Sequence, residues 1–132
     1  MPFPLDIKYV TQTEQKLGVK FPASFVVKMV KQNGGSVSTA YDTWSLHPFL
    51  DASDRKRLAR TCNDISRETS AARAWPRFPP DAVVIGSNGG GDLLILLPPE
   101  DNPSVLLHEI FWWEHETGEV QIVADDFSEL KP

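Results

Sequence analysis

The chain has 132 residues, of which 18 are acidic and 13 are lysine or arginine, so its formal net charge is −5. This length favours one globular domain over residues 1–132, and no apolar run approaches the roughly 20 residues that span a bilayer. The first residues lack the basic and apolar regions of a secretory signal, and the single cysteine, Cys62, excludes an intrachain disulfide. These features predict a cytoplasmic protein without a membrane partner.

The charge is unevenly distributed along the chain. Residues 1–77 carry twelve basic and seven acidic residues, whereas residues 78–132 carry eleven acidic residues and only Lys131. A balance of −10 in the second segment argues against direct nucleic-acid binding there, because phosphates would be repelled. It suits a basic protein partner. The alternative is that the acidic residues only solvate turns and strand edges.

Two helices are predicted near the N-terminus. The first covers about residues 5–17, because apolar residues recur at helical spacing and Gly18 follows them. The second begins at Pro22, whose missing N–H costs nothing in a first helical turn. Asn33-Gly34-Gly35 is expected to end it, since glycine adopts the left-handed conformation after a last turn without steric cost.

The middle of the chain predicts an extended segment and then a long helix. Residues 36–46, which include Tyr41, alternate loosely and are rich in β-branched and aromatic residues. Residues 53–75 are predicted as one helix with Ser53 as its N-cap, Cys62 in its interior and Pro76 beyond its end.

The rest of the chain predicts an antiparallel meander. Residues 82–86 and 92–97 form a hairpin around the Gly86–Asp92 turn, and strands follow at residues 105–116 and 119–123, with a short acidic-capped turn at 125–130. Because an apolar run follows the glycine turn, it does not form a phosphate loop, which would lead into a helix. The predicted fold class is therefore α+β, with a mostly antiparallel, meander-like β-sheet packed with the N-terminal and central helices.

Several short motifs occur in an order that resembles the SMI1/KNR4 family of the SUKH superfamily. They are Glu14, Leu17-Gly18, Phe21-Pro22, Asn33-Gly34-Gly35, the turn from Ile85-Gly86 to Gly91-Asp92, the segment Phe111 to Glu116, and Phe127 to Leu130. The resemblance implies an α+β domain with helices packed on an antiparallel sheet. Bacterial members are immunity proteins that bind and neutralise a cognate toxin of a polymorphic or contact-dependent system, many such toxins being nucleases. Fungal relatives are regulatory scaffolds, and this alternative stays open.

No constellation of residues predicts catalysis, a cofactor or a metal site. The three histidines, His47, His108 and His115, lack the spacing of metal ligands. His108 and His115, seven residues apart on one predicted strand, would point to opposite faces. Ser87 does not lie in a nucleophile elbow, which needs a strand-to-helix turn. An enzyme is therefore the least favoured class.

The candidate partner-binding residues lie at the glycine turn and along the strand at 105–116. Trp112 and Trp113 are adjacent on a strand, so one ring lies on each face of the sheet. One face must pack under the helices, and the other is a candidate interface in which an aromatic anchor lies beside acidic residues. The alternative is that helices and loops cover both rings. The predicted residues are Asp92, Glu109, Trp112, Trp113, Glu114 and Glu116.

Asp92 has two possible roles. It belongs to a partner-binding turn, or its carboxylate accepts backbone N–H groups of the glycine loop and fixes that loop. The structural role is favoured. The partner implied for the whole surface is a basic protein, a cognate toxin with nucleases among the candidates.

Overall fold

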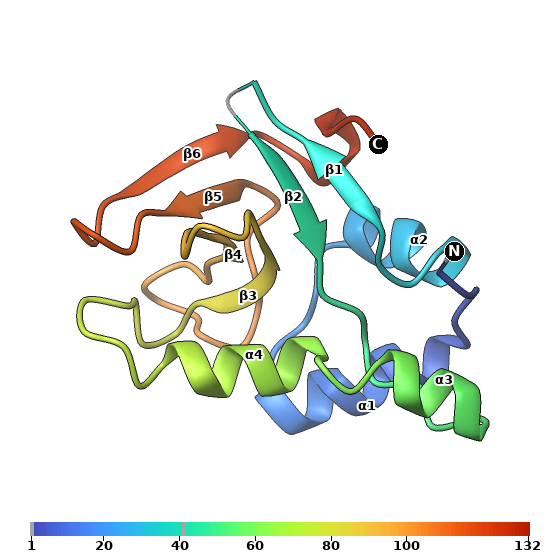
Figure 1. The fold of residues 1–132 in the computed structure, drawn as a ribbon. Coiled ribbons are helices and arrows are strands. Elements are labelled where there is room, and N and C mark those ends of the chain that lie inside the picture. Colours follow the sequence, from blue (N-terminus) through green and yellow to red (C-terminus); the bar gives the residue numbers. More distant parts are fainter. Residues whose placement is uncertain (1, 41) are drawn as a thin grey trace.

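A computed structural model describes residues 2–40 and 42–132, and Figure 1 shows helices packed against one curled sheet. Within the described part of the chain the helices are α1 (Ile7–Leu17), α2 (Ala23–Lys31), α3 (Arg55–Arg60), α4 (Ile65–Ala72) and the short 3-10 helix η1 (Phe127–Glu129). The strands are β1 (Ser36–Ser38), β2 (Thr43–Leu46), β3 (Val83–Ser87), β4 (Leu93–Leu96), β5 (Ile110–Trp113) and β6 (Val120–Ala124). The predicted α+β class is confirmed.

The sheet is a meander whose spatial order, β1-β2-β3-β4-β5-β6, is also the order along the chain, and all neighbours are antiparallel. The hairpin predicted around the glycine turn is confirmed as β3–β4. The extended segment predicted at 36–46 is the hairpin β1–β2, although Tyr41 lies outside the described residues.

The two N-terminal helices end in different ways. Gly18 follows α1 with φ 70°, in the left-handed conformation that glycine adopts without a Cβ clash. Gln32 follows α2 in an extended conformation, with φ −154°. The expected left-handed glycine cap is therefore wrong for α2. Gly34 and Gly35 have positive φ angles of 124° and 90°, but they turn the chain into β1 after the helix has ended.

The single helix predicted over residues 53–75 is wrong, because the chain forms α3 and α4 with a break between them. Asp54, rather than Ser53, caps α3 by accepting a hydrogen bond from the backbone N–H of Arg57, and Asp64 starts α4 by accepting one from Ser66. A short polar side chain that captures the first N–H groups favours a helix start. Cys62 lies exposed in the break rather than inside a helix.

The long strand predicted over residues 105–116 is also wrong, because only Ile110–Trp113 pairs as β5. The segment before it bonds elsewhere: the N–H of Leu106 donates to the Lys20 carbonyl at 3.0 Å, and that of Leu107 to the Leu97 carbonyl at 2.8 Å. His108 and His115 consequently lie outside β5. The prediction that they point to opposite faces of one strand is therefore wrong.

Apolar side chains pack on both faces of the sheet. The first core lies between the sheet and the helices α1 and α2, and includes Phe25, Trp44 and Ile110. The second core lies on the face that α4 covers, and its buried members are Ala72, Phe78, Ala82, Val84, Ile95 and Trp113. α4 is tied to β3 by a hydrogen bond from the Val84 N–H to Thr69 Oγ1 at 3.0 Å. None of the helices in the described part of the chain has the length and apolar character needed to cross a bilayer.

Candidate protein-interaction site

Asp92, which directly precedes β4, joins β4 to the end of β5 through one side chain. Its Oδ2 accepts a hydrogen bond from Trp112 Nε1 at 3.0 Å, and its Oδ1 accepts one from the backbone N–H of His115 at 3.1 Å. Oδ1 also lies 2.6 Å from His115 Nδ1, so that nitrogen carries the proton. The favoured role, in which the Asp92 carboxylate accepts N–H groups of the glycine loop, is therefore wrong, because the carboxylate binds Trp112 and His115 at the end of β5 instead. Asn88 binds that loop, by accepting from the Gly90 N–H at 2.9 Å.

The environment of Asp92 stabilises its charged form. Burial raises the pKa of the carboxyl, but the hydrogen bonds from His115 and Trp112 outweigh burial and hold that pKa below its ordinary value. A carboxylate that accepts several N–H groups is expected to behave in this way. Asp92 is thus an anion at neutral pH that holds two neighbouring groups in place.

His115 is held from two sides. Its ring is oriented by Asp92 and lies against Gly91, where an added Cβ would come within 2.8 Å of the ring carbon Cε1. Gly91 also has φ 102°, which L side chains rarely adopt. Asp–histidine pairs also orient catalytic bases, but the hydrogen bonds of the described residues give His115 no hydroxyl or thiol partner. What the arrangement supplies is an imidazole fixed at the surface, with its side chain one-third exposed.

The acidic turn, defined as residues 114–119, joins β5 to β6 and is held by an element distant in sequence. Within the turn, the Glu114 N–H donates to the Glu119 carbonyl at 2.9 Å, and the Gly118 N–H donates to the Glu114 carbonyl at 2.7 Å. Arg77 Nη2 donates to the Glu116 carbonyl at 3.0 Å, and the Arg77 carbonyl accepts from Trp113 Nε1 at 3.3 Å. The backbone of the acidic turn is therefore held in place by contacts on both sides, and the turn carries its carboxylates on this fixed backbone.

The two predicted tryptophans lie on opposite faces of β5, and both contact a core. Trp113 is fully buried against Phe78, with ring centroids 5.2 Å apart, and belongs to the second core. Trp112 is half-buried against the first core, where its ring meets Trp44 at 5.7 Å. The alternative prediction, that both rings are covered, is thus confirmed for Trp113 and holds only in part for Trp112. Glu109 is half-buried and directly precedes β5, at the opposite end of the strand from the acidic turn.

The cover over the second core ends before the sheet does, and this leaves apolar side chains exposed. One row of successive cross-strand partners runs from β3 to β6, and its members share the face of the second core. They are Val84, Ile95, Phe111 and Ile122. Val84 and Ile95 are fully buried and Phe111 is half-buried, whereas Ile122 is 55% exposed. Figure 1 shows the reason, because α4 runs beside β3 and does not reach β5 or β6.

Two further side chains extend this exposed surface. Val120, the partner of Trp113 on β6, is 38% exposed, and Trp75, whose ring centroid lies 5.8 Å from that of Trp113, is 44% exposed. The open face, defined as Trp75, Phe111, Val120 and Ile122, therefore adjoins the acidic turn at Val120. None of the four was a candidate from sequence, because their exposure depends on where α4 ends. His115 and Arg77 were missed because both act through tertiary contacts.

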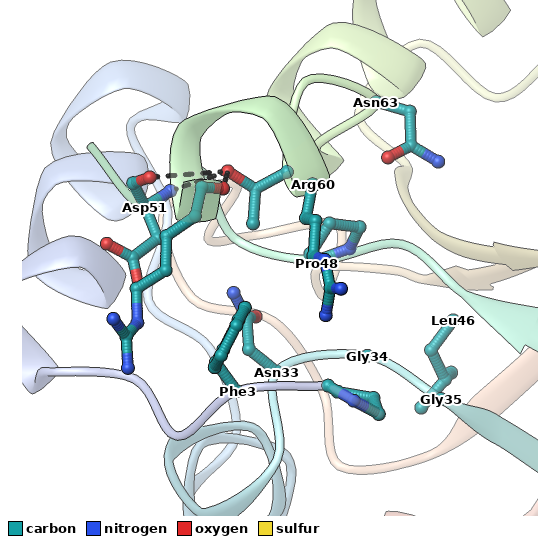
Figure 2. A pocket seen from close by; sticks show the side chains of 12 residues that line it. Phe3, Asn33, Gly34, Gly35, Leu46, Pro48, Asp51, Arg60 and Asn63 are labelled. Carbon is teal, nitrogen blue, oxygen red and sulfur yellow. Dashed lines mark hydrogen bonds and ion pairs between the residues drawn. The ribbon is translucent and has the colours of Figure 1, made fainter. Parts of the chain in front are cut away.

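A cavity of about 400 Å³ lies on another side of the molecule, near α3. Figure 2 shows Phe3, Asn33, Pro48, Asp51 and Arg60 around it. The Asp51 N–H donates a hydrogen bond to Thr61 Oγ1 at 3.0 Å. Its buried polar groups bind one another or nearby backbone: Asn33 both donates to and accepts from the backbone of Phe49, at 2.9 and 2.8 Å. These bonds connect the end of α2 to the segment before α3, so the cavity marks a junction between elements.

Residues 2–40 and 42–132 contain no group of three or more His, Cys, Asp or Glu side chains placed to hold a metal ion. Fold and site together define the class as an α+β domain with a six-stranded antiparallel meander, one face of which is partly uncovered beside an acidic turn.

The model of the SMI1/KNR4 family (SUKH-1) matches residues 4–131, and the chain belongs to this family. Comparison with curated proteins and with solved structures gave no match. Membership supports a domain of the immunity-protein type, in a family that is generally non-enzymatic and binds protein partners.

Proposed function

We propose that the protein is a cytoplasmic immunity protein that neutralises a cognate toxin by forming a stoichiometric complex with it. Family membership supports the type of protein. The observation that carries the interface is the open face beside the acidic turn, where exposed apolar side chains adjoin carboxylates on a turn whose backbone is held in place. A surface with a central apolar patch and a charged rim is typical of protein interfaces.

The negative charge around the open face and the acidic turn favours a basic partner. Residues 109–126 contain six acidic residues and no lysine or arginine. Among the described residues, Arg77 contacts the acidic turn, and its guanidinium donates to backbone carbonyls there rather than to the carboxylates. The uncompensated carboxylates attract a basic surface during approach, which raises the association rate and makes it depend on salt.

The fixed conformation of the acidic turn lowers the cost of binding. Ordering a loop on association opposes affinity. Here Asp92 and Arg77 already hold the turn from two sides in the unbound protein. The apolar anchors, Trp75 and Ile122, then determine how long the complex lasts, because large side chains in an interface mainly control dissociation.

The experiment measures binding to a toxin encoded beside the gene for this chain, after the toxin's activity has been authenticated. Replacing Glu116 and Glu119 with lysine should slow association and weaken its salt dependence. The matched control replaces Glu100 and Asp101, two exposed acidic residues in the β4–β5 loop, with lysine. The control has the same net charge and should associate faster than the test variant, because its charge reversal lies outside the proposed interface.

Dissociation tests the apolar part of the interface. Trp75→Ala should increase the dissociation rate about tenfold or more if the ring is an anchor. Equal effects of the two charge reversals, together with an unchanged dissociation rate for folded Trp75→Ala, would contradict this interface. Absence of any toxin partner in the host would instead favour a regulatory scaffold.

A further inference from the structure

The two outer strands of the sheet differ in what covers them. β1 bonds to the C-terminal segment: Ser38 N–H donates to the Lys131 carbonyl at 2.6 Å, and Lys131 N–H donates back at 3.4 Å. On β6, in the described part of the chain, no strand pairs with the side away from β5. Val120, Gln121 and Ile122 are all exposed. The sheet therefore has one open edge, and it borders the proposed interface.

β6 also lacks most of the features that protect edge strands. Proteins block pairing at a free edge with lysine or other charged residues, proline, or a bulge. β6 reads Val-Gln-Ile-Val-Ala, without a charge or a proline. A register shift leaves Val123 unpaired with β5, so a bulge interrupts only the second half of the strand. The segment from Val120 to Ile122 remains open to a pairing strand, whereas the backbone N–H and carbonyl of Glu119 are bonded within the acidic turn.

We propose that β6 is the docking edge for an extended, basic segment of the partner, which adds to the sheet as a seventh strand along residues 120–122. This rests on the proposed function and specifies its mode of recognition. The incoming backbone would bond to the free N–H and C=O groups of β6, and alternate side chains would lie on the open face or beside the acidic residues. Apolar residues of the segment would contact Ile122 and Val120, while its cations would meet Glu119 and the other carboxylates of the acidic turn.

Charge favours this occupant over a second copy of the same chain. Pairing β6 with β6 would bring together two regions that each carry six acidic residues and no lysine or arginine between residues 109 and 126. Like charges brought close in this way oppose association. A segment in which lysine or arginine alternates with β-branched residues meets no such repulsion and matches the strand period of two.

The test uses the full isotope-labelled chain and a synthetic probe, so it does not need the toxin. The probe is an eight-residue peptide that alternates lysine and valine, with both ends blocked. One control peptide replaces lysine with glutamate. The other retains the lysines but carries N-methyl groups on alternate amides, which removes the donors that would face β6 while keeping the charge. Binding is followed by amide chemical shifts and hydrogen exchange at low salt.

The lysine–valine peptide should shift and protect amides within residues 120–122, and the N-methylated peptide should bind at least about tenfold more weakly. Ile122→Lys should weaken binding to a similar extent. Val27→Lys is the matched control, because Val27 on α2 is 56% exposed, against 55% for Ile122, and the charge change is the same. It should leave binding within about twofold.

Equal binding of the N-methylated peptide, or shifts spread over the acidic residues without protection of β6, would show electrostatic adhesion only and overturn the proposal. Absence of binding, or pairing at β1, would also overturn it. A chain that inhibits its toxin but fails this test refutes strand addition alone. A chain that binds the peptide at β6 but inhibits no toxin refutes the proposed function.

Discussion

Replacing Asp92 with asparagine should destabilise the protein without unfolding it. The carboxylate accepts from Trp112 Nε1, from the His115 backbone and from the His115 ring, at 3.0, 3.1 and 2.6 Å. Asparagine has one acceptor oxygen, and its NH₂ group would face a donor. Hydrogen bonds to charged groups contribute about 1.5–3 kcal/mol each and neutral ones about 1 kcal/mol, so we expect a loss of about 2–3 kcal/mol.

The loss of stability in Asp92→Asn should depend on pH. The pKa of Asp92 is lowered in the folded protein, so its contribution to stability is complete above the unfolded pKa of about 3.9. That contribution is lost as the pH falls through the folded pKa. The difference in unfolding free energy between the wild type and Asp92→Asn should therefore be largest near pH 7 and should shrink below about pH 3.9.

Urea denaturation of both proteins from pH 7 to pH 3 measures this difference. Asp101→Asn, at an exposed loop position, is the control and should remain within about 0.5 kcal/mol of the wild type. A difference that is the same at pH 3 as at pH 7, or below about 0.5 kcal/mol throughout, would refute the role assigned to the carboxylate.

Three further predictions concern packing and chemistry. Gly91→Ala should cost more than Gly89→Ala in urea denaturation, because both have positive φ but only the Cβ at Gly91 meets the His115 ring; equal losses would contradict this contact. Trp113→Ala should lower the unfolding free energy by about 3–5 kcal/mol, because the ring is fully buried, and a loss below about 1 kcal/mol would contradict that burial. The purified protein should show no hydrolase or transferase turnover and no stoichiometric zinc, and activity abolished by a point mutation would refute this.

The sequence predicted the parts of the fold that local signals determine. The hairpin around the Gly86–Asp92 turn and the capped end of α1 at Gly18 depend on residues close together in the chain. The break between α3 and α4 also had a local signal, because Asn63-Asp64 is a favourable helix start inside the predicted helix. A single helix was nevertheless predicted because the apolar positions Leu58, Cys62 and Ile65 recur at helical spacing across the break.

The candidate site was less predictable because its exposure depends on tertiary packing. Strand alternation correctly placed Trp112 and Trp113 on opposite faces, but it does not say which parts of a face a helix covers. α4 ends at Ala72 and packs on β3, so it leaves Ile122 on β6 exposed. That boundary cannot be read from the pattern of β5. Partner binding by Asp92, Glu109, Trp112, Trp113, Glu114 and Glu116 stays a prediction.

The central claim is neutralisation of a toxin by stoichiometric binding. The most direct measurement titrates the activity of the authenticated cognate toxin with the purified protein, at toxin concentrations well above the dissociation constant of the complex. The proposed function predicts that activity falls linearly and reaches its minimum at one molecule of this protein per toxin. Full toxin activity in the presence of excess folded protein would contradict it.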